Sequence, residues 1–268
     1  MGVVNVTPDS FSDGGRWFDT DTAIAHGHEL IEQGADIVDV GGESTRPGAV
    51  RVDAEEEQRR VLPVIRALSA AGAVVSIDTM NADTAERALS AGARIVNDVS
   101  GGRADARMTA VAAMARVPFV VMHWRAHSAQ MQQHTRYEDV VADVTEELLR
   151  QLDDAVAAGI DPANIIVDPG LGFSKTGDQN WELLAQLEAF TALGHPLLVA
   201  ASRKRFLGDV LARDGVPRPT DEREDATVAL TTLAALADAW AVRVHAPRPS
   251  ADAVRVVRRL RQAERLEQ

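Results

Sequence analysis

Four polar side chains in this sequence form a set that suits a flat heterocycle: Asp78, Asn97, Asp168 and Lys204. Each of them follows a separate short apolar run. Buried carboxylates accept paired ring N–H groups, an amide matches an edge that both donates and accepts, and an ammonium donates to a ring oxygen or nitrogen. A single Asp after a strand can equally cap a helix or pair with Lys or Arg. Four such residues after four runs favour a ligand site.

A second set suits phosphate or diphosphate. Arg243 and His245 are spaced i and i+2, so on a strand they point to the same face. Together with Arg46 and Lys204 they could bind an anion, Arg through its fork and Lys as a point charge. The alternative is that Arg243 and His245 pair with carboxylates of the protein. Asn5 could supply a neutral oxygen to a hydrated Mg2+, although a lone Asn often satisfies backbone groups instead.

The elements that position these residues alternate between strand and helix eight times. The opening example is 36–48, DIVDVGGESTRPG, where the β-branched run suits a buried strand and Gly41-Gly42 allows a tight turn. The predicted strands are 1–6, 37–40, 74–77, 95–96, 119–122, 165–167, 197–200 and 242–244. The predicted helices are 20–33, 54–71, 82–90, 106–114, 139–158, 180–193, helical sequence from about 202 to about 240, and 250–265. For the first helix we expect Thr20 or Asp21 as N-cap and Gly34 as C-cap.

Eight such units predict an α/β protein, a single-domain (β/α)8 TIM barrel over residues 1–268. A doubly wound open sheet is the competing fold, and it is disfavoured because no Gly-x-Gly-x-x-Gly follows the first strand. In a barrel the carboxyl ends of all strands share one rim. We therefore expect one mouth to gather the residues that follow the strands, namely Asn5, Asp78, Asn97, His123, Asp168, Lys204 and His245.

Two connections on that rim, 7–19 and 41–53, are longer than usual β–α loops. Their Gly, Asp, Ser and Thr content suggests lids that a ligand orders, with Phe11, Thr45 and Pro47 as contact groups. Disordered surface loops are the alternative.

Composition restricts the possible partners. The sequence holds 28 Lys and Arg against 40 Asp and Glu, a net charge of −12, which argues against a nucleic-acid surface and against anionic lipid. No apolar run is long enough to cross a membrane, and the N-terminal residues lack the basic region and apolar segment that we would expect of a secretory signal. The absence of cysteine excludes disulfides and fits a reducing, cytoplasmic location, which we expect.

Two further motifs resemble known sites only superficially. GLGFSKT, residues 170–176, lacks the glycine that precedes the lysine of a P-loop. His123 and His127 are four residues apart, but their segment has the character of a loop, and we do not expect zinc there.

Seven blocks in order closely resemble bacterial dihydropteroate synthases, with features of the actinobacterial branch in MHWRA (122–126) and VSGGRAD (99–105). The blocks are NVTPDSFSDGG (5–15), DVGGESTRPGA (39–49), SIDT (76–79), NDVSGG (97–102), DPGLGFSKT (168–176), SRK (202–204) and RVH (243–245). The resemblance implies a transferase of folate biosynthesis that joins (7,8-dihydropterin-6-yl)methyl diphosphate to 4-aminobenzoate, releases pyrophosphate and is a target of sulfonamides.

The resemblance also implies roles for residues. Asp78, Asn97, Asp168 and Lys204 would hold the pterin, and Asn5, Arg243 and His245 the diphosphate and its Mg2+. Phe11, Thr45, Pro47, Phe173 and Ser202 would shape the aminobenzoate site, with Asp13 and Arg46 as further substrate contacts. We expect catalysis to rest on Asp78, Asp168, Lys204, Arg243 and His245, through an SN1-like displacement. We also expect Ser202 to open the seventh helix and free N–H groups there to receive the aminobenzoate carboxylate.

Two other activities are considered. A pterin-dependent methyltransferase would share the barrel but has no need of the long TPDSFSDGG and STRPG loops. A catalytically inactive pterin-binding paralogue would be expected to have lost part of those loops or of the SRK block, and all are present. The resemblance further implies a homodimer, with the last helices as the expected interface.

Overall fold

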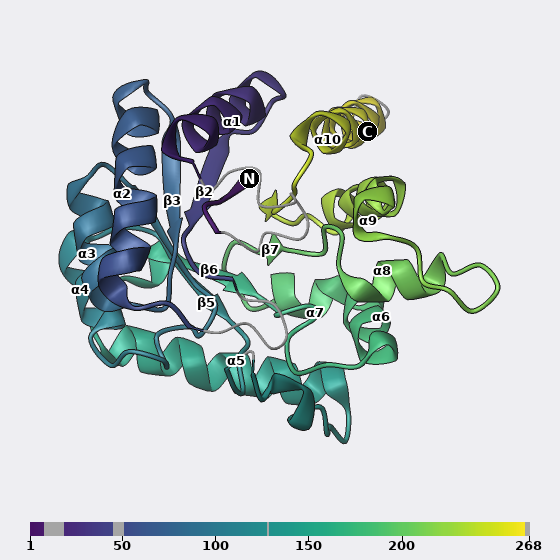
Figure 1. Ribbon diagram of the computed structural model, residues 1–268. Helices are drawn as coiled ribbons and strands as arrows, with labels where there is room; N and C mark the ends of the chain where they lie inside the picture. The colour runs from purple at the N-terminus through teal and green to yellow at the C-terminus, as the bar shows by residue number, and fades with distance from the viewer. Residues whose placement is uncertain (8–18, 45–50, 128, 266–268) are drawn as a thin grey trace.

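The computed structural model describes residues 1–7, 19–44, 51–127 and 129–265. Its strands are β1 (Gly2–Asn5), β2 (Ile37–Gly41), β3 (Val74–Asp78), β4 (Ile95–Asp98), β5 (Phe119–Met122), β6 (Ile165–Asp168), β7 (Leu198–Val199) and β8 (Ala241–Val242). Its α-helices are α1 (Thr20–Glu32), α2 (Ala54–Ala70), α3 (Ala82–Ser90), α4 (Met108–Ala115), α5 (Val140–Ala157), α6 (Gly177–Ala185), α7 (Leu187–Thr191), α8 (Arg205–Val210), α9 (Glu224–Leu236) and α10 (Pro247–Arg265). Figure 1 shows helices surrounding the central strands.

The strands form a closed parallel barrel. β1 to β6 pair in sequence order, and β7 pairs with β8. Val167 donates its N–H to Pro196 O at 2.9 Å, which joins β6 to the β7 side. Val3 donates to Val244 O at 3.1 Å and Val244 donates to Met1 O at 2.9 Å, which joins the β8 side to β1. The predicted (β/α)8 barrel is therefore confirmed.

The inside of the barrel has an apolar layer beneath a polar one. The buried residues of the apolar layer form one cluster of Met1, Ile95, Val120, Ile166 and Leu198. Side chains two positions apart on a strand share a face, so the residues two positions after Ile95 and Ile166 also point inward. These are Asn97 and Asp168, each at most 4% exposed. The apolar layer supports the polar residues at the carboxyl end of the strands.

Several predicted helix ends and breaks differ from the structure. Asp19, rather than Thr20 or Asp21, caps α1 through a bond from Thr22 N to its carboxylate, and the C-cap is Gln33, with Gly34 following at φ +99°. The helix expected over 180–193 is two helices, α6 and α7, which meet at Gln186. The helical sequence expected to about 240 is interrupted between α8 and α9, where Pro217 and Pro219 cannot donate backbone N–H bonds.

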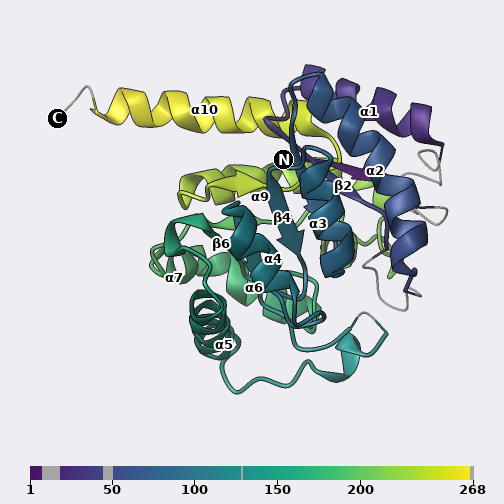
Figure 2. The same ribbon diagram turned by 90° about the vertical axis from the view of Figure 1, so that its left-hand side faces the viewer.

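Helix α10 packs along α9. Figure 2 shows α10 extending past the rest of the molecule. Among the described residues, no helix combines the length and the apolar character that a membrane crossing requires.

Candidate active site

The strand register brings polar residues from distant parts of the chain to one level of the barrel. Asn5 lies opposite Gly41, Gly41 opposite Asp78, and Asp78 opposite Asn97. Asp168 ends β6 opposite Met122 of β5. The predicted convergence of Asn5, Asp78, Asn97 and Asp168 on one mouth is what these pairings produce.

One side of the mouth is an ion-pair cluster centred on Arg243. The guanidinium donates from Nε to Asp39 Oδ2 at 2.6 Å and from Nη2 to Asp78 Oδ2 at 2.7 Å. Asn97 Nδ2 donates to the same oxygen of Asp39 at 3.0 Å. The paired alternative considered for Arg243 is thus the arrangement in this structure. A diphosphate that binds Arg243 has to compete with two carboxylates.

Burial dominates the electrostatics of that cluster. It raises the pKa of Asp78 to about 7, because the charge of Arg243 offsets only part of the desolvation and the neighbouring Asp39 adds repulsion. Burial by itself would lower the pKa of Arg243, but attraction to Asp39 and Asp78 outweighs it and the net shift is upward. Arg243 stays charged, while Asp78 can hold or release a proton near neutral pH.

The opposite side of the mouth is formed by Asp168 and Lys204. Asp168 Oδ1 accepts the N–H of Gly170 at 2.7 Å. Lys204 Nζ donates to Leu171 O and lies 4.8 Å from the ring centroid of Phe173. Burial raises the pKa of Asp168 against the opposing charge of Lys204, and burial lowers the pKa of Lys204 to about 8 against the opposing charge of Asp168. Phe173 and Lys204 are therefore adjacent, as a shared substrate site requires.

Ser202 and His245 form a pair beside this side of the mouth. Ser202 Oγ lies 2.9 Å from His245 Nδ1 and accepts the His245 backbone N–H at 3.2 Å. The prediction that Ser202 opens a helix is wrong: α8 begins at Arg205 after the N-cap Lys204, because Arg203 adopts a left-handed conformation at φ +58°. Ser202 acts through its hydroxyl on His245 and not as a helix terminus.

His123 does not face the mouth, contrary to our expectation. Val120 of β5 points into the barrel, so alternation along the strand turns His123 outward toward α5. Both of its ring nitrogens are engaged there, by Lys175 and by Glu147. His123 belongs to the layer behind the site.

The long connections are described only at their ends. Phe11, Asp13, Thr45, Arg46 and Pro47, predicted as substrate contacts, lie outside the described residues. At the base of the second connection, Glu43 accepts bonds from Arg51 Nε at 3.3 Å and Val52 N at 3.1 Å. This carboxylate joins the two ends of the segment that carries Thr45, Arg46 and Pro47.

Asn5 could supply one neutral oxygen ligand to a hydrated Mg2+. It is half-buried at the end of β1, level with Gly41 and Asp78. Across the described ranges, no group of three His, Cys, Asp or Glu side chains is placed to hold a metal ion. A hydrated Mg2+ suits such a site, because it keeps several waters and binds through one or two protein ligands plus substrate phosphates.

Two residues of the site were missed by the sequence reasoning. Asp39 is fully buried and bridges Arg243 and Asn97. Its signal was a carboxylate placed among the β-branched residues of β2, two positions after Ile37 on the inward face. Lys175 is 3% exposed and lies behind Asp168. Its motif was set aside because it is not a P-loop.

Comparison with known proteins decides the family. The family model for pterin-binding enzymes matches residues 1–245. The dihydropteroate synthase of Mycobacterium leprae is 56% identical over 259 residues, which cover 96% of this chain and 91% of that protein. The chain belongs to the dihydropteroate synthase family. The dihydropteroate synthase of Bacillus subtilis is 45% identical over 91% of this chain and 82% of that protein.

Solved dihydropteroate synthases share the fold as well as the sequence. The Xanthomonas albilineans enzyme with 4-aminobenzoic acid is 42% identical and superposes with a TM-score of 0.89, covering 97% of this chain and 92% of that one. The Yersinia pestis enzyme with a sulfonamide drug complex is 36% identical with a TM-score of 0.93, covering 98% and 94%. The family resemblance read from the seven sequence blocks is confirmed.

Proposed function

We propose that the protein joins (7,8-dihydropterin-6-yl)methyl diphosphate to 4-aminobenzoate, giving 7,8-dihydropteroate and pyrophosphate in tetrahydrofolate biosynthesis. The observation that carries the proposal is 56% identity over 96% of the chain with a dihydropteroate synthase. The mouth adds chemistry of the right kind, with two buried carboxylates, an amide and an ammonium. Neither the methyltransferase nor the inactive paralogue is favoured by a specific observation.

The pterin would lie between the two sides of the mouth. Its ring N–H groups would donate to Asp168 and Asp78, and its polar edge would meet the amide of Asn97. Lys204 would donate to an acceptor atom of the pterin ring. Its ammonium lies over the ring of Phe173, so the pterin would lie next to Phe173 as well. Buried carboxylates are strong acceptors for paired N–H donors, so this arrangement selects a ring that presents them.

The reaction would proceed by dissociation before attack. The bond between the methylene carbon and the diphosphate oxygen breaks, and the electron pair leaves with pyrophosphate. The cationic carbon is stabilised by the pterin and by the nearby negative charge of Asp78 and Asp168. The amino nitrogen of 4-aminobenzoate then donates its lone pair to that carbon and loses a proton to the departing pyrophosphate or to water. No covalent bond to the protein forms.

The leaving diphosphate would be held by Arg243 and His245. Arg243 can offer its fork to phosphate oxygens when it gives up its bonds to Asp39 or Asp78. The His245 ring is oriented by Ser202 Oγ. Asn5 would hold a hydrated Mg2+, and that ion would supply positive charge beside the diphosphate oxygens.

The second substrate would lie toward Phe173 and Ser202, with Phe11, Thr45 and Pro47 supplied by the long connections and Asp13 and Arg46 as further contacts. A sulfonamide would compete at this position. The Xanthomonas albilineans and Yersinia pestis relatives were solved with 4-aminobenzoic acid and with a sulfonamide drug complex, respectively.

We propose a homodimer formed through α9 and α10. These neighbouring helices carry exposed apolar side chains, namely Leu233, Leu236, Val254, Val256 and Leu260. Light scattering should give twice the chain mass, and Leu236→Glu with Leu260→Glu should give the monomer. A cytoplasmic location remains our expectation from the cysteine-free sequence.

The test of the function is product formation by the purified protein. With pterin diphosphate, Mg2+ and 4-aminobenzoate, we expect pyrophosphate release and a product of the mass of dihydropteroate, suppressed by a sulfonamide. Pterin binding without any product would favour the inactive paralogue. Failure to bind the pterin at all would overturn the assignment of the mouth.

A further inference from the structure

The chain has 28 basic residues, and only two of them are lysines, Lys175 and Lys204. Both donate to backbone carbonyls of one short turn, residues 170–173. Lys204 binds Leu171 O from the mouth, whereas Lys175 binds Gly170 O at 3.1 Å and Phe173 O at 3.0 Å from the buried side. An Arg-rich chain thus places its two ammonium groups on opposite sides of one turn. A compact group with three donors suits converging carbonyls better than the planar fork of Arg.

Lys175 has a complete set of partners although it is buried. Its third acceptor is His123 Nδ1 at 2.9 Å. Three acceptors match the three N–H groups of an ammonium, which has no lone pair of its own. Since the ammonium can only donate, Nδ1 of His123 accepts and Nε2 carries the ring proton. That proton is donated to Glu147 Oε2 at 2.9 Å.

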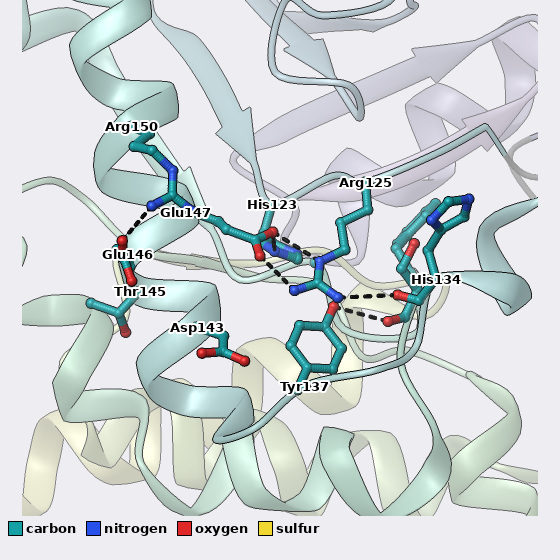
Figure 3. A network of polar contacts seen from close by, with 12 residues as sticks. His123, Arg125, His134, Tyr137, Asp143, Thr145, Glu146, Glu147 and Arg150 are labelled. Atoms are coloured by element: carbon teal, nitrogen blue, oxygen red, sulfur yellow. Dashed lines mark hydrogen bonds and ion pairs between the residues drawn. The ribbon is translucent and has the colours of Figure 1, made fainter.

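The groups behind Lys175 keep His123 neutral and Glu147 ionised. Burial, with the charge of Lys175, lowers the pKa of His123 to about 4. Burial alone would raise the pKa of Glu147, but bonds from His123 and Arg125 outweigh it and the net shift is downward. Figure 3 shows Glu147 between His123 and Arg125. The hydrogen bonds from Lys175 to His123 and from His123 to Glu147 therefore each have one defined donor.

The same network reaches the turn from a second direction. Arg125 lies 3.7 Å from the ring centroid of Tyr137, and Tyr137 donates its hydroxyl to Ser174 O at 2.9 Å. Ser174, at the end of the turn, needs this support because it is a non-glycine residue at φ +50°, whereas Gly170 and Gly172 adopt φ +69° and +79° without strain. A backbone held in sparsely populated conformations persists only where its surroundings impose it.

The turn connects Lys175 to Asp168, the carboxylate proposed to bind the pterin. Gly170 accepts from Lys175 with its carbonyl and donates its N–H to Asp168 Oδ1 at 2.7 Å. The positive groups that face Asp168 are Lys204, Lys175 and Arg243. Burial lowers the pKa of Lys175 to about 7; attraction to Asp168 and Glu147 opposes that shift, and repulsion from Lys204 and Arg125 adds to it. Lys175 thus acts on Asp168 both through a peptide group and through its charge.

We propose that Lys175 is a positioning residue for pterin recognition, fixing the 170–173 turn and supporting the negative charge of Asp168 from the side that no substrate reaches. The inference rests on the proposed function and adds a residue to it. Lys204 would be free to change partners when the pterin binds, because Lys175 continues to hold the turn.

The test measures binding of the unreactive pterin 6-hydroxymethylpterin by calorimetry from about pH 7.5 downward, following the loss of binding that protonation of Asp168, whose pKa is raised by burial, should cause. Lys175→Gln keeps two donors but removes the charge, and Lys175→Arg keeps the charge. Thr176→Ala is the matched control, since it removes the N-cap of α6 next to Lys175 without a change of charge.

We expect Lys175→Gln to weaken pterin binding about tenfold at about pH 6, where Lys175 carries its charge, as loss of a charged hydrogen bond does. The loss of binding on acidification should also begin at a higher pH, because Asp168 protonates more easily without a facing cation. Lys175→Arg should restore the wild-type pH midpoint for the loss of pterin binding, even where its affinity for the pterin is lower. Thr176→Ala should leave that pH midpoint unchanged.

Nitrogen NMR of protein labelled in its two lysines gives a second readout. The Lys175 Nζ signal of the wild-type protein is the one that disappears in Lys175→Gln. At pH 6 and below, this signal should be that of an ammonium in slow exchange with water. A neutral amine there, or wild-type affinity and midpoint in Lys175→Gln, would overturn the proposal. If the wild-type protein binds no pterin, the proposed function is wrong. The NMR experiment then still shows whether Lys175 is charged, independently of pterin binding.

Discussion

The two sides of the mouth bind their charged groups in different ways. Around Arg243, side chains on β2, β3 and β4 bind one another across the strands: Asp39, Asp78 and Asn97. Around Asp168, the lysines bind backbone carbonyls of a turn. The first side is fixed by strand register and the second by a loop conformation. A ligand therefore has to displace side-chain partners on the first side, whereas it meets a supported turn on the second.

The two sides also differ in charge. Two carboxylates share one guanidinium on the Arg243 side, and burial, together with repulsion from Asp39, raises the pKa of Asp78 to about 7 against the charge of Arg243. On the other side one carboxylate faces two ammonium groups. We expect the first side to be the more sensitive to loss of a cation.

The largest expected effect is that of Arg243→Met. It leaves Asp39 and Asp78 buried without a cation, and breaking a buried pair in this way costs about 3–5 kcal/mol of unfolding free energy. Urea unfolding at neutral pH should show the loss, and turnover should disappear. Adding Asp39→Asn should recover part of the stability. Arg255→Met, which breaks an exposed pair with Asp252, is the control and should leave stability nearly unchanged.

Glu57 is a further buried carboxylate near the Arg243 side, where its charge adds to the upward pKa shift of Asp78. It is 2% exposed on α2, and burial raises its pKa from 4.5 to about 7, against the bond from Thr84. Since the folded pKa lies above the unfolded one, stability should fall as pH rises from 4.5 toward 7. Glu57→Gln should remove that fall, a gain of up to about 3 kcal/mol at high pH. Parallel stability curves for the two proteins would refute the assignment.

Asp168→Asn tests the turn side. The amide presents a donor where the pterin offers one, so we expect pterin affinity to fall roughly 10-fold to 100-fold. Stability should change little, because Gly170 N can still donate to the amide oxygen. Titration calorimetry with 6-hydroxymethylpterin measures the affinity, and an unchanged value would remove Asp168 from the site.

His245→Ala should have the smallest effect of the four, about a tenfold rise in KM for the pterin diphosphate, as loss of one hydrogen bond to a charged group predicts. Binding of a pterin without phosphates should be unaffected, which makes it the internal control. Wild-type kinetics would count against a diphosphate role. Ser202→Ala should reproduce a fraction of the effect, because Ser202 orients the ring.

The strand-borne half of the site was accessible from the sequence. Apolar runs that end in Asp78, Asn97 and Asp168 predict inward-facing polar groups, since alternation and strand ends follow from local pattern. Asp39 was not predicted as a site residue, because it lies within the apolar run of β2 and not after its end. That it bridges Arg243 and Asn97 is a consequence of barrel closure, which local pattern does not specify.

The loop-borne half was accessible only in part. The strand pattern placed Lys204 near the mouth and the family resemblance added Phe173, but neither predicted the left-handed residues that shape the turn or the break before α8. Ser202 was assigned to a helix because its neighbours read as helical. Lys175 and His123 were misjudged for a common reason, since which side of a loop or strand a residue faces depends on long-range packing.

A crystal structure with 6-hydroxymethylpterin and pyrophosphate would test most directly the claim that both sides of the mouth hold one substrate. The account predicts one pterin ring in contact with Asp78 and Asn97 on one side and with Asp168 and Lys204 on the other, and pyrophosphate on Arg243 and His245. A pterin bound to one side alone, or outside the mouth, would contradict it.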